Sequence, residues 1–182
     1  MILLFEHPDC LHRLVQELDT ALPAIDEPIT HSKVMDLPYL NAVLYESLRL
    51  RTPISTALPR ITPPEGAVLC NYFVPGGVNI ALYAISTSTS NYDRPKVFDP
   101  DRWLVSPELV SEMKKAHMAF SMGPRVCIGK NLAWLKMRMT LASLLRTFTF
   151  ELVPGQNLQP TLRSVLRPMD SKLLVTASKR AV

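Results

Sequence analysis

The stretch FSMGPRVCIG, from Phe120 to Gly129, is the segment that decides the fold of this 182-residue chain. Apolar residues recur at helical spacing after it, which predicts a long helix from Ile128 to Phe148. Cys127 is therefore expected at the N-terminus of that helix, where free backbone N–H groups stabilise an anion such as a thiolate. Gly123 and Gly129 permit a tight turn and a close approach of the backbone to a bound group.

The order F-x-x-G-x-R-x-C-x-G in this stretch resembles the cysteine loop of the cytochromes P-450, which are haem-thiolate monooxygenases. In that family the cysteine holds the haem iron by its thiolate, which pushes electron density onto the iron and favours O–O bond cleavage. The resemblance therefore implies haem as the cofactor and Cys127 as its axial ligand. The alternative is a buried structural thiol in a Gly-Pro loop, and the five accompanying motif residues argue against it.

The same resemblance implies contacts between the haem and several other side chains. Phe120 is expected to pack beside the sulfur and exclude water, and Gly129 follows two residues after Cys127 in the motif. Arg125 is expected to pair with a haem propionate, a charge-assisted contact that suits its planar fork. Arg60, in a segment similar to the family's propionate-binding segment, is a second candidate. His117 is a third candidate, with a surface histidine as the equal alternative.

A second motif is E-S-L-R, from Glu46 to Arg49, in a helix expected from Leu37 to Leu50. Helical periodicity places both charges opposite the apolar stripe, which favours a solvated ion pair worth only about 0.2 to 0.5 kcal/mol. In the family, the E-x-x-R pair is instead buried and linked to an arginine of a later loop. The segment from Phe98 to Trp103 resembles that loop. The resemblance thus implies a buried structural triad with Arg102, tolerable because each charge is paired and hydrogen-bonded.

Periodicity and turn residues predict a mainly α-helical chain with small β-sheets, an α+β class. The resemblance implies one partial domain over residues 1–182, the C-terminal part of the cytochrome P-450 fold, with an all-helical core and short strands. The segment 92–120 is expected to be irregular. The remaining expected elements are the end of a helix at 1–5, helices at 8–22 and 84–90, and strands at 57–60, 67–70, 78–83, 149–153 and 173–176.

The composition is that of a globular protein, with 47% hydrophobic residues, 16 prolines and only 6 glycines. This balance predicts ordered loops punctuated by proline. The three cysteines are widely spaced, so they predict neither a disulfide framework nor a zinc site, and they favour a reducing compartment. The formal net charge of +4 comes without a long run of like charges, which argues against nucleic acid as a partner.

Basic residues gather around the cysteine motif, and they form either a solvated face or a docking surface for an acidic protein. The resemblance favours docking of an electron donor, either an NADPH-dependent reductase or another donor protein. It also implies a small apolar organic substrate. Segments 53–58 and 164–169 are expected to line the pocket for that substrate. The basic residues concerned are Lys114, Lys115, Lys130, Lys136 and Arg138.

No segment approaches the roughly 20 consecutive apolar residues that a membrane-spanning helix needs. The resemblance implies the endoplasmic reticulum membrane for full-length members, whereas this sequence shows no anchor or signal and is expected to be cytoplasmic on its own. The family's oxygen-activating motif, A/G-G-x-D/E-T, has no match. Two functions remain: an oxidoreductase that inserts one oxygen atom from O2 into its substrate, or a truncated, noncatalytic remnant that binds haem without turnover.

Overall fold

The computed structural model describes residues 1–24, 28–54, 58–82, 91–162, 166–169 and 172–180. Within these ranges the strands form four separate two-stranded antiparallel sheets, and helices make up the body of the molecule. The expected mainly helical α+β class is therefore confirmed. The helices are α1 (Ile2–Glu6), α2 (Pro8–Ala21), α3 (His31–Val34), α4 (Pro38–Leu50), α5 (Pro107–Ala116) and α6 (Lys130–Thr147), with 3-10 helices η1 (Pro100–Leu104) and η2 (Gly123–Arg125). The sheets pair β1 (Leu58–Ile61) with β4 (Asn79–Leu82), β2 (Ala67–Leu69) with β3 (Tyr72–Val74), β5 (Phe148–Leu152) with β8 (Val175–Lys179), and β6 (Pro160–Leu162) with β7 (Leu166–Pro168).

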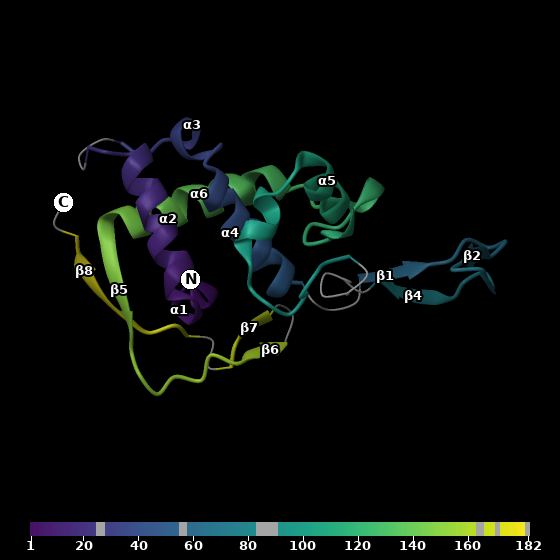
Figure 1. Ribbon diagram of the computed structural model, residues 1–182. Helices are drawn as coiled ribbons and strands as arrows, with labels where there is room; N and C mark the ends of the chain where they lie inside the picture. Colours follow the sequence, from purple (N-terminus) through teal and green to yellow (C-terminus); the bar gives the residue numbers. More distant parts are fainter. Residues whose placement is uncertain (25–27, 55–57, 83–90, 163–165, 170–171, 181–182) are drawn as a thin grey trace.

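The core lies where α2, α4 and α6 pack against one another (Figure 1). The leucine stripe predicted for α2 faces this core, and full burial of each such side chain contributes about 1.5 to 3 kcal/mol. The apolar stripe of α4 meets it from the second helix, as the periodicity predicts. The side chains that are completely or almost completely buried here are Leu14, Leu18, Leu40, Val43, Ala142 and Leu145.

The start of α4 is set by a side chain of α2. Pro38 occupies the first turn, as expected, because its missing N–H would have no partner there. The carboxylate of Glu17 accepts hydrogen bonds from the backbone N–H groups of Tyr39 and Leu40, both at 2.7 Å. Glu17 thus satisfies two of the free donors at the helix end and complements its positive dipole. The bonds also fix α4 relative to α2.

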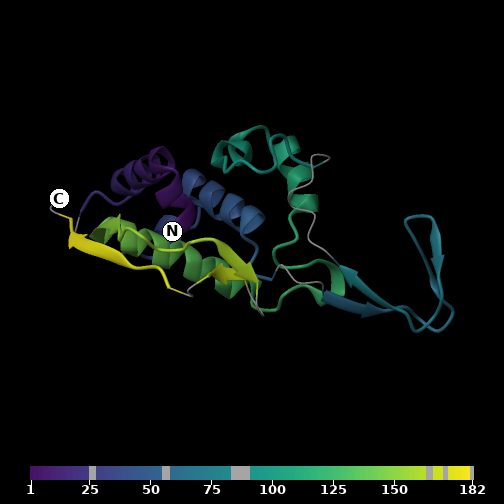
Figure 2. The same ribbon diagram turned by 90° about the horizontal axis from the view of Figure 1, so that it is seen from below.

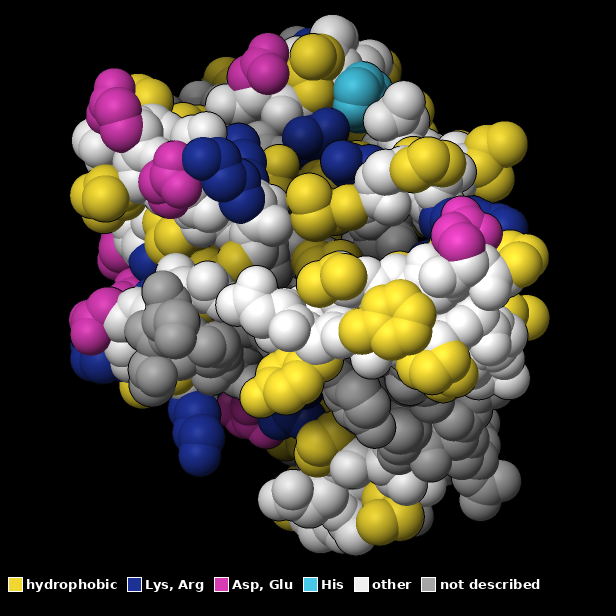
Figure 3. All heavy atoms as spheres, turned by 90° about the vertical axis from the view of Figure 1, so that its right-hand side faces the viewer, with side chains coloured by type: hydrophobic (Ala, Val, Ile, Leu, Met, Phe, Trp, Pro, Cys, Tyr) yellow, Lys and Arg dark blue, Asp and Glu magenta, His cyan; other side chains and the backbone are white. Residues whose placement is uncertain are grey.

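Two hairpins project from the helical body as an extended arm (Figures 1 and 2). The β1–β4 pair forms its base, and the β2–β3 pair forms its far end. β1, β2 and β4 begin and end within one residue of the sequence prediction, apart from residues 57 and 83, which lie outside the described ranges, whereas β3 was not predicted. Apolar side chains of the outer hairpin are exposed, among them Tyr72 at 76% and Phe73 at 65%. Figure 3 shows the face of the molecule that carries the arm, with hydrophobic side chains scattered across it.

The structure corrects the expected irregular segment 92–120, because α5 lies within it. The sequence carries a signal for this helix. Ser106 accepts a hydrogen bond from the backbone N–H of Leu109 at 3.4 Å, and Pro107 occupies the first helical position. Periodicity did not predict this helix, because the apolar stripe of α5 is weak. The expected helix at 84–90 falls outside the described residues.

At the C-terminal end, β5 and β8 form the expected sheet, with Leu152 opposite Val175. The bidentate ion pair between Arg180 and Asp19 joins this sheet to α2, with nitrogen–oxygen distances of 2.9 and 2.6 Å. Among the helices of the described ranges, none is long and apolar enough to cross a membrane.

Candidate functional site

The cysteine loop, residues 118–129, connects α5 to α6 and closes on itself through backbone hydrogen bonds. The N–H of Cys127 donates to the carbonyl of Phe120 at 2.9 Å, and the N–H of Lys130 donates to the carbonyl of Cys127 at 3.2 Å. Gly123 has a φ of +65°, a conformation that favours glycine. α6 begins at Lys130 rather than at Ile128, since the preceding Gly129 already has nonhelical backbone angles suited to the N-cap.

The Cys127 thiol lies beside the first turn of α6 and is exposed. A Cβ atom built on Gly129 would stand 3.8 Å from the sulfur, so the thiol lies against the residue that caps the helix. The sulfur therefore lies close to the residue from which α6 begins. The sequence prediction of a cysteine at a helix N-terminus agrees with this placement.

Uncovered apolar side chains continue from the thiol along α6. Leu132 and Leu135 are spaced i and i+3 on α6, so they share one face, and their exposed fractions are 58% and 39%. Ile128, in the loop just before the helix, is 103% exposed. An apolar row of this kind on a protein surface indicates that another group covers it. A thiol beside a helix N-terminus, with an open apolar face next to it, fits a flat apolar macrocycle whose metal takes a sulfur ligand.

The other predicted cofactor contacts lie on several different elements. Phe120 is half-buried, and its ring packs toward Trp134, with ring centroids 6.4 Å apart. Arg125 is exposed in η2. Arg60 lies on β1, in the arm, where it donates to the carbonyl of Pro59 at 2.9 Å. The cysteine loop therefore groups Phe120 and Arg125 with the thiol, whereas Arg60 belongs to a separate element.

His117, the third propionate candidate, packs against α4 and η1. Its Nε2 lies 3.1 Å from the carbonyl oxygen of Tyr45, to which it donates, and its ring meets those of Tyr45 and Trp103 edge-on at centroid distances of 5.3 and 5.4 Å. The imidazole is thus turned toward α4 and η1. Aromatic packing, which single-sequence patterns do not show, decides its position.

Acidification is expected to weaken the fold through His117. Burial lowers the pKa of His117 below its usual value of 6.5, and the hydrogen bond to Tyr45 opposes this shift only in part. Folding thus favours the neutral imidazole, so the stability is fully present above pH 6.5 and is lost as the pH falls through 6.5 toward the lower pKa. Thermal melting between about pH 7.5 and 5.5 measures this, and His117→Gln should flatten the profile. The matched variant His12→Gln, at an exposed site on α2, should keep the wild-type profile.

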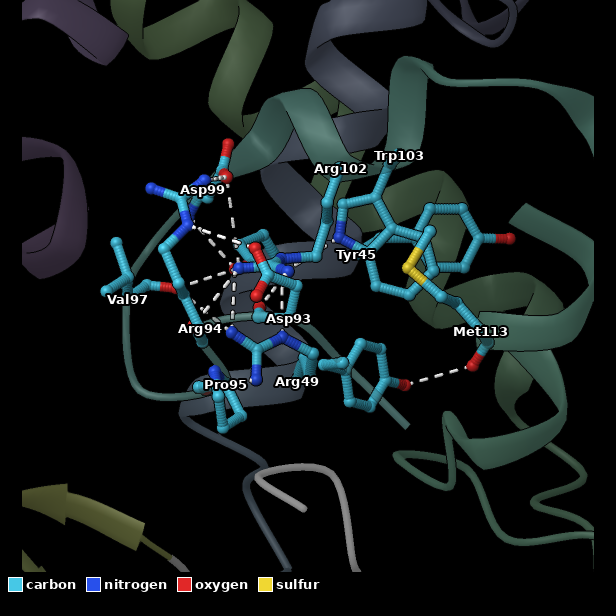
Figure 4. Close-up of polar contacts among 12 residues, drawn as sticks. Tyr45, Arg49, Asp93, Arg94, Pro95, Val97, Asp99, Arg102, Trp103 and Met113 are labelled. Carbon is cyan, nitrogen blue, oxygen red and sulfur yellow. Dashed lines mark hydrogen bonds and ion pairs between the residues drawn. The ribbon is translucent and has the colours of Figure 1, made fainter. Parts of the chain in front are cut away.

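A buried charged cluster lies next to Trp103, whose ring stacks on that of Tyr45 (Figure 4). Glu46 and Arg49 are 0% and 1% exposed, and the guanidinium of Arg49 donates to both carboxylate oxygens at 2.8 and 2.7 Å. Arg102 comes from η1 and donates through Nε to the same carboxylate at 3.0 Å. The interpretation from periodicity, a solvated pair on α4, is therefore wrong. The polar side of α4 is covered by η1 and the loop before it, and the three charged residues meet there as the family resemblance implies.

Two further donors complete the hydrogen bonding of Glu46. The backbone N–H of Asp99 donates to Oε1 at 3.0 Å, and the indole Nε1 of Trp103 donates to Oε2 at 2.9 Å. Burial by itself raises the pKa of Glu46, but the donors from Arg49, Asp99 and Trp103 outweigh it and hold the pKa below its usual range. The carboxylate is thus ionised and fully paired at neutral pH.

The two arginines of the cluster also satisfy backbone carbonyls of the preceding loop. Arg49 donates to the carbonyls of Pro95 and Val97, and Arg102 donates to that of Asp93 at 2.6 Å. The cluster therefore holds a loop that lacks regular structure of its own. Sequence analysis missed Trp103 as a member, although it is adjacent to Arg102 in the motif and a buried indole N–H needs an acceptor.

The basic residues near the cysteine loop are only partly free to meet another protein. Lys115 pairs with Glu112 at 2.6 Å, and the Lys114 ammonium lies 5.1 Å from the centre of the Tyr45 ring. Arg138 donates to Asn41 at 2.9 Å. Lys130 and Lys136 on α6 are exposed.

Comparison with known proteins adds the family. The family model described as cytochrome P-450 matches residues 1–175. The chain is 41% identical over 153 residues to the cytochrome P-450 monooxygenase atr2 of Stereocaulon alpinum and 38% identical over 153 residues to the cytochrome P-450 monooxygenase macH of Penicillium terrestre. These alignments cover 83% and 82% of the chain but 30% of each relative, so the chain spans about 30% of the length of these curated relatives.

A solved structure agrees with the same assignment. The haem domain of a cytochrome P-450DA mutant matches 99% of the chain with a TM-score of 0.85 and 25% sequence identity. The chain covers 40% of that structure.

Proposed function

Because this chain belongs to the cytochrome P-450 family, we propose that it is the part of a haem-thiolate monooxygenase that holds the haem iron through Cys127. The observation that carries the proposal is the exposed thiol at the start of α6 with an uncovered apolar row beside it. A bound haem supplies dioxygen activation and the transfer of one oxygen atom to an organic substrate. We also propose that residues 1–182 form part of one domain, since α1, α2, α4 and α6 share a single core.

The chain's own residues have distinct roles in this proposal. Cys127 supplies the sulfur just before the N-terminus of α6, and Gly129 lies against that sulfur. Phe120 shields the loop from water, and the exposed guanidinium of Arg125 is available to a carboxylate at the edge of the macrocycle. Arg60 is retained as a second carboxylate partner. Glu46, Arg49 and Arg102 fix α4 against η1 and so hold the scaffold of the site.

The proposed partners follow from the family and from the charge around the loop. An electron-donor protein with an acidic surface, such as an NADPH-dependent reductase, is proposed to meet the exposed Lys130 and Lys136. The proposed substrate is a small apolar organic molecule, and the described parts of segments 53–58 and 164–169 are its proposed lining. We place the whole protein at the endoplasmic reticulum membrane.

The proposal predicts that the purified chain binds added haem in the reduced state with a thiolate ligand. A carbon monoxide difference spectrum reports thiolate ligation directly, and titration with haem gives the stoichiometry. One haem per chain with the thiolate band is the expected result. A spectrum without that band at saturating haem would contradict the proposal.

A turnover assay separates the two functions that the sequence left open. A chain that binds haem but oxidises no apolar substrate when a reductase and NADPH are supplied is the noncatalytic alternative. This alternative remains open because the chain spans about 30% of the length of the two relatives.

A further inference from the structure

The two ends of the cysteine loop rest on the same aromatic ring. His117 directly precedes the loop, and Trp134 lies in α6 just after it. The ring of Tyr45, from α4, meets that of Trp134 at a centroid distance of 4.6 Å and that of His117 at 5.3 Å. The carbonyl of Tyr45 also accepts the hydrogen bond from His117. One residue of α4 thus contacts the chain on both sides of the loop.

The orientation of the Tyr45 ring is itself fixed by the buried charged cluster (Figure 4). Trp103 stacks on it at a centroid distance of 5.0 Å and an interplanar angle of 24°. The same indole donates to Glu46, the next residue after Tyr45. Lys114 lies over the ring with its ammonium 5.1 Å from the centre, a cation–π contact. A continuous set of contacts therefore runs from the Glu46 carboxylate through Trp103 and Tyr45 to both ends of the loop.

The residues in the middle of the cysteine loop make few contacts that would fix their position. Every residue from Met122 to Ile128 is exposed, and backbone hydrogen bonds join the two sides of the loop. A segment with few buried contacts opens locally unless its ends are held. The place of Cys127 relative to the helical body is thus set by the two anchored ends.

We propose that Tyr45 positions the cysteine loop by contacting His117 and Trp134 at its two ends. This inference rests on the proposed function, because the loop has a role to be positioned for only if Cys127 holds the iron. Tyr45 is a positioning residue, since it acts on the thiol through two neighbours. The family motifs assign no role to this residue.

Amide hydrogen exchange of the 182-residue chain without haem tests the proposal. Tyr45→Leu keeps an apolar side chain but removes the ring contacts with His117 and Trp134, along with the stacking on Trp103. Exchange of residues 118–129 should become about tenfold faster, the size expected for losing the two aromatic pairs that hold the loop. Exchange of α2 should stay at the wild-type rate. Tyr45→Phe keeps the ring, and its loop should exchange like the wild type.

Unchanged exchange of the loop in Tyr45→Leu would overturn the proposal, and so would equal acceleration of the loop and α2. If Tyr45→Leu does not fold, Tyr45→Met takes its place, because it also removes the ring and leaves the contact between Phe120 and Trp134 intact. That variant should also speed loop exchange, and an unchanged rate would be a contradiction.

With haem added, Tyr45→Leu should lower the fraction of haem that carries the thiolate ligand, and Tyr45→Phe should restore it. A wild-type chain that binds no haem would contradict the proposed function alone, since the exchange experiment needs no cofactor. The two failures are therefore distinguishable.

Discussion

Cys127→Ser is expected to abolish thiolate ligation of haem completely and to leave the fold unchanged. A serine hydroxyl remains protonated near neutral pH and does not replace a thiolate as a soft axial ligand. The Cys127 side chain is exposed and takes no part in the core, so the melting temperature should stay at the wild-type value. The carbon monoxide difference spectrum and thermal melting measure the two halves of this prediction.

The chain offers two matched controls for this variant. Cys70 is exposed at the end of the outer hairpin, and Cys10 is partly buried on α2. Cys70→Ser and Cys10→Ser should both keep the thiolate band. Loss of the band in either control, or its survival in Cys127→Ser, would show that another thiol holds the iron.

Glu46→Ala is expected to cause the largest loss of stability of any single substitution in the charged cluster. It leaves Arg49 and Arg102 buried without their shared carboxylate, and breaking one partner of a buried ion pair costs about 3 to 5 kcal/mol. This is a large part of the roughly 5 to 15 kcal/mol that stabilises a typical domain. Chemical denaturation followed by far-ultraviolet circular dichroism gives the free energy of unfolding.

An exposed ion pair of the same spacing serves as the control. Glu112 and Lys115 on α5 are about two-thirds exposed, at 67% and 66%, and Glu112→Ala should cost no more than about 1 kcal/mol. Arg102→Ala should approach the effect of Glu46→Ala, because it removes the link between α4 and η1. Similar, small costs for Glu46→Ala and Glu112→Ala would mean that the cluster contributes nothing beyond a surface pair.

Local patterns predicted much of the fold. The leucine spacing of α2, the prolines before α2 and α4, and the turns between the strands depend on neighbouring residues only. These elements accordingly begin and end within one or two residues of their predicted positions. The long helix α6 followed from the same periodicity, although Gly129 delays its start to Lys130.

The site was less predictable from patterns. Periodicity placed Glu46 on the solvated side of α4, because it takes no account of the η1 segment that covers that side. His117 packs edge-on against the rings of Tyr45 and Trp103, contacts that the sequence pattern does not show. Trp103 was missed as a partner of Glu46, since their contact spans 57 positions in the chain.

The sequence by itself determined the family and the candidate axial ligand, because the spacing around Cys127 is a local, ordered motif that needs no knowledge of distant contacts. Only the tertiary structure decided which charges are buried and what holds the cysteine loop. Burial and aromatic packing are made by residues far apart in the chain, and their energies depend on which groups exclude water from one another. The Glu46 cluster and the Tyr45 ring are products of that long-range packing.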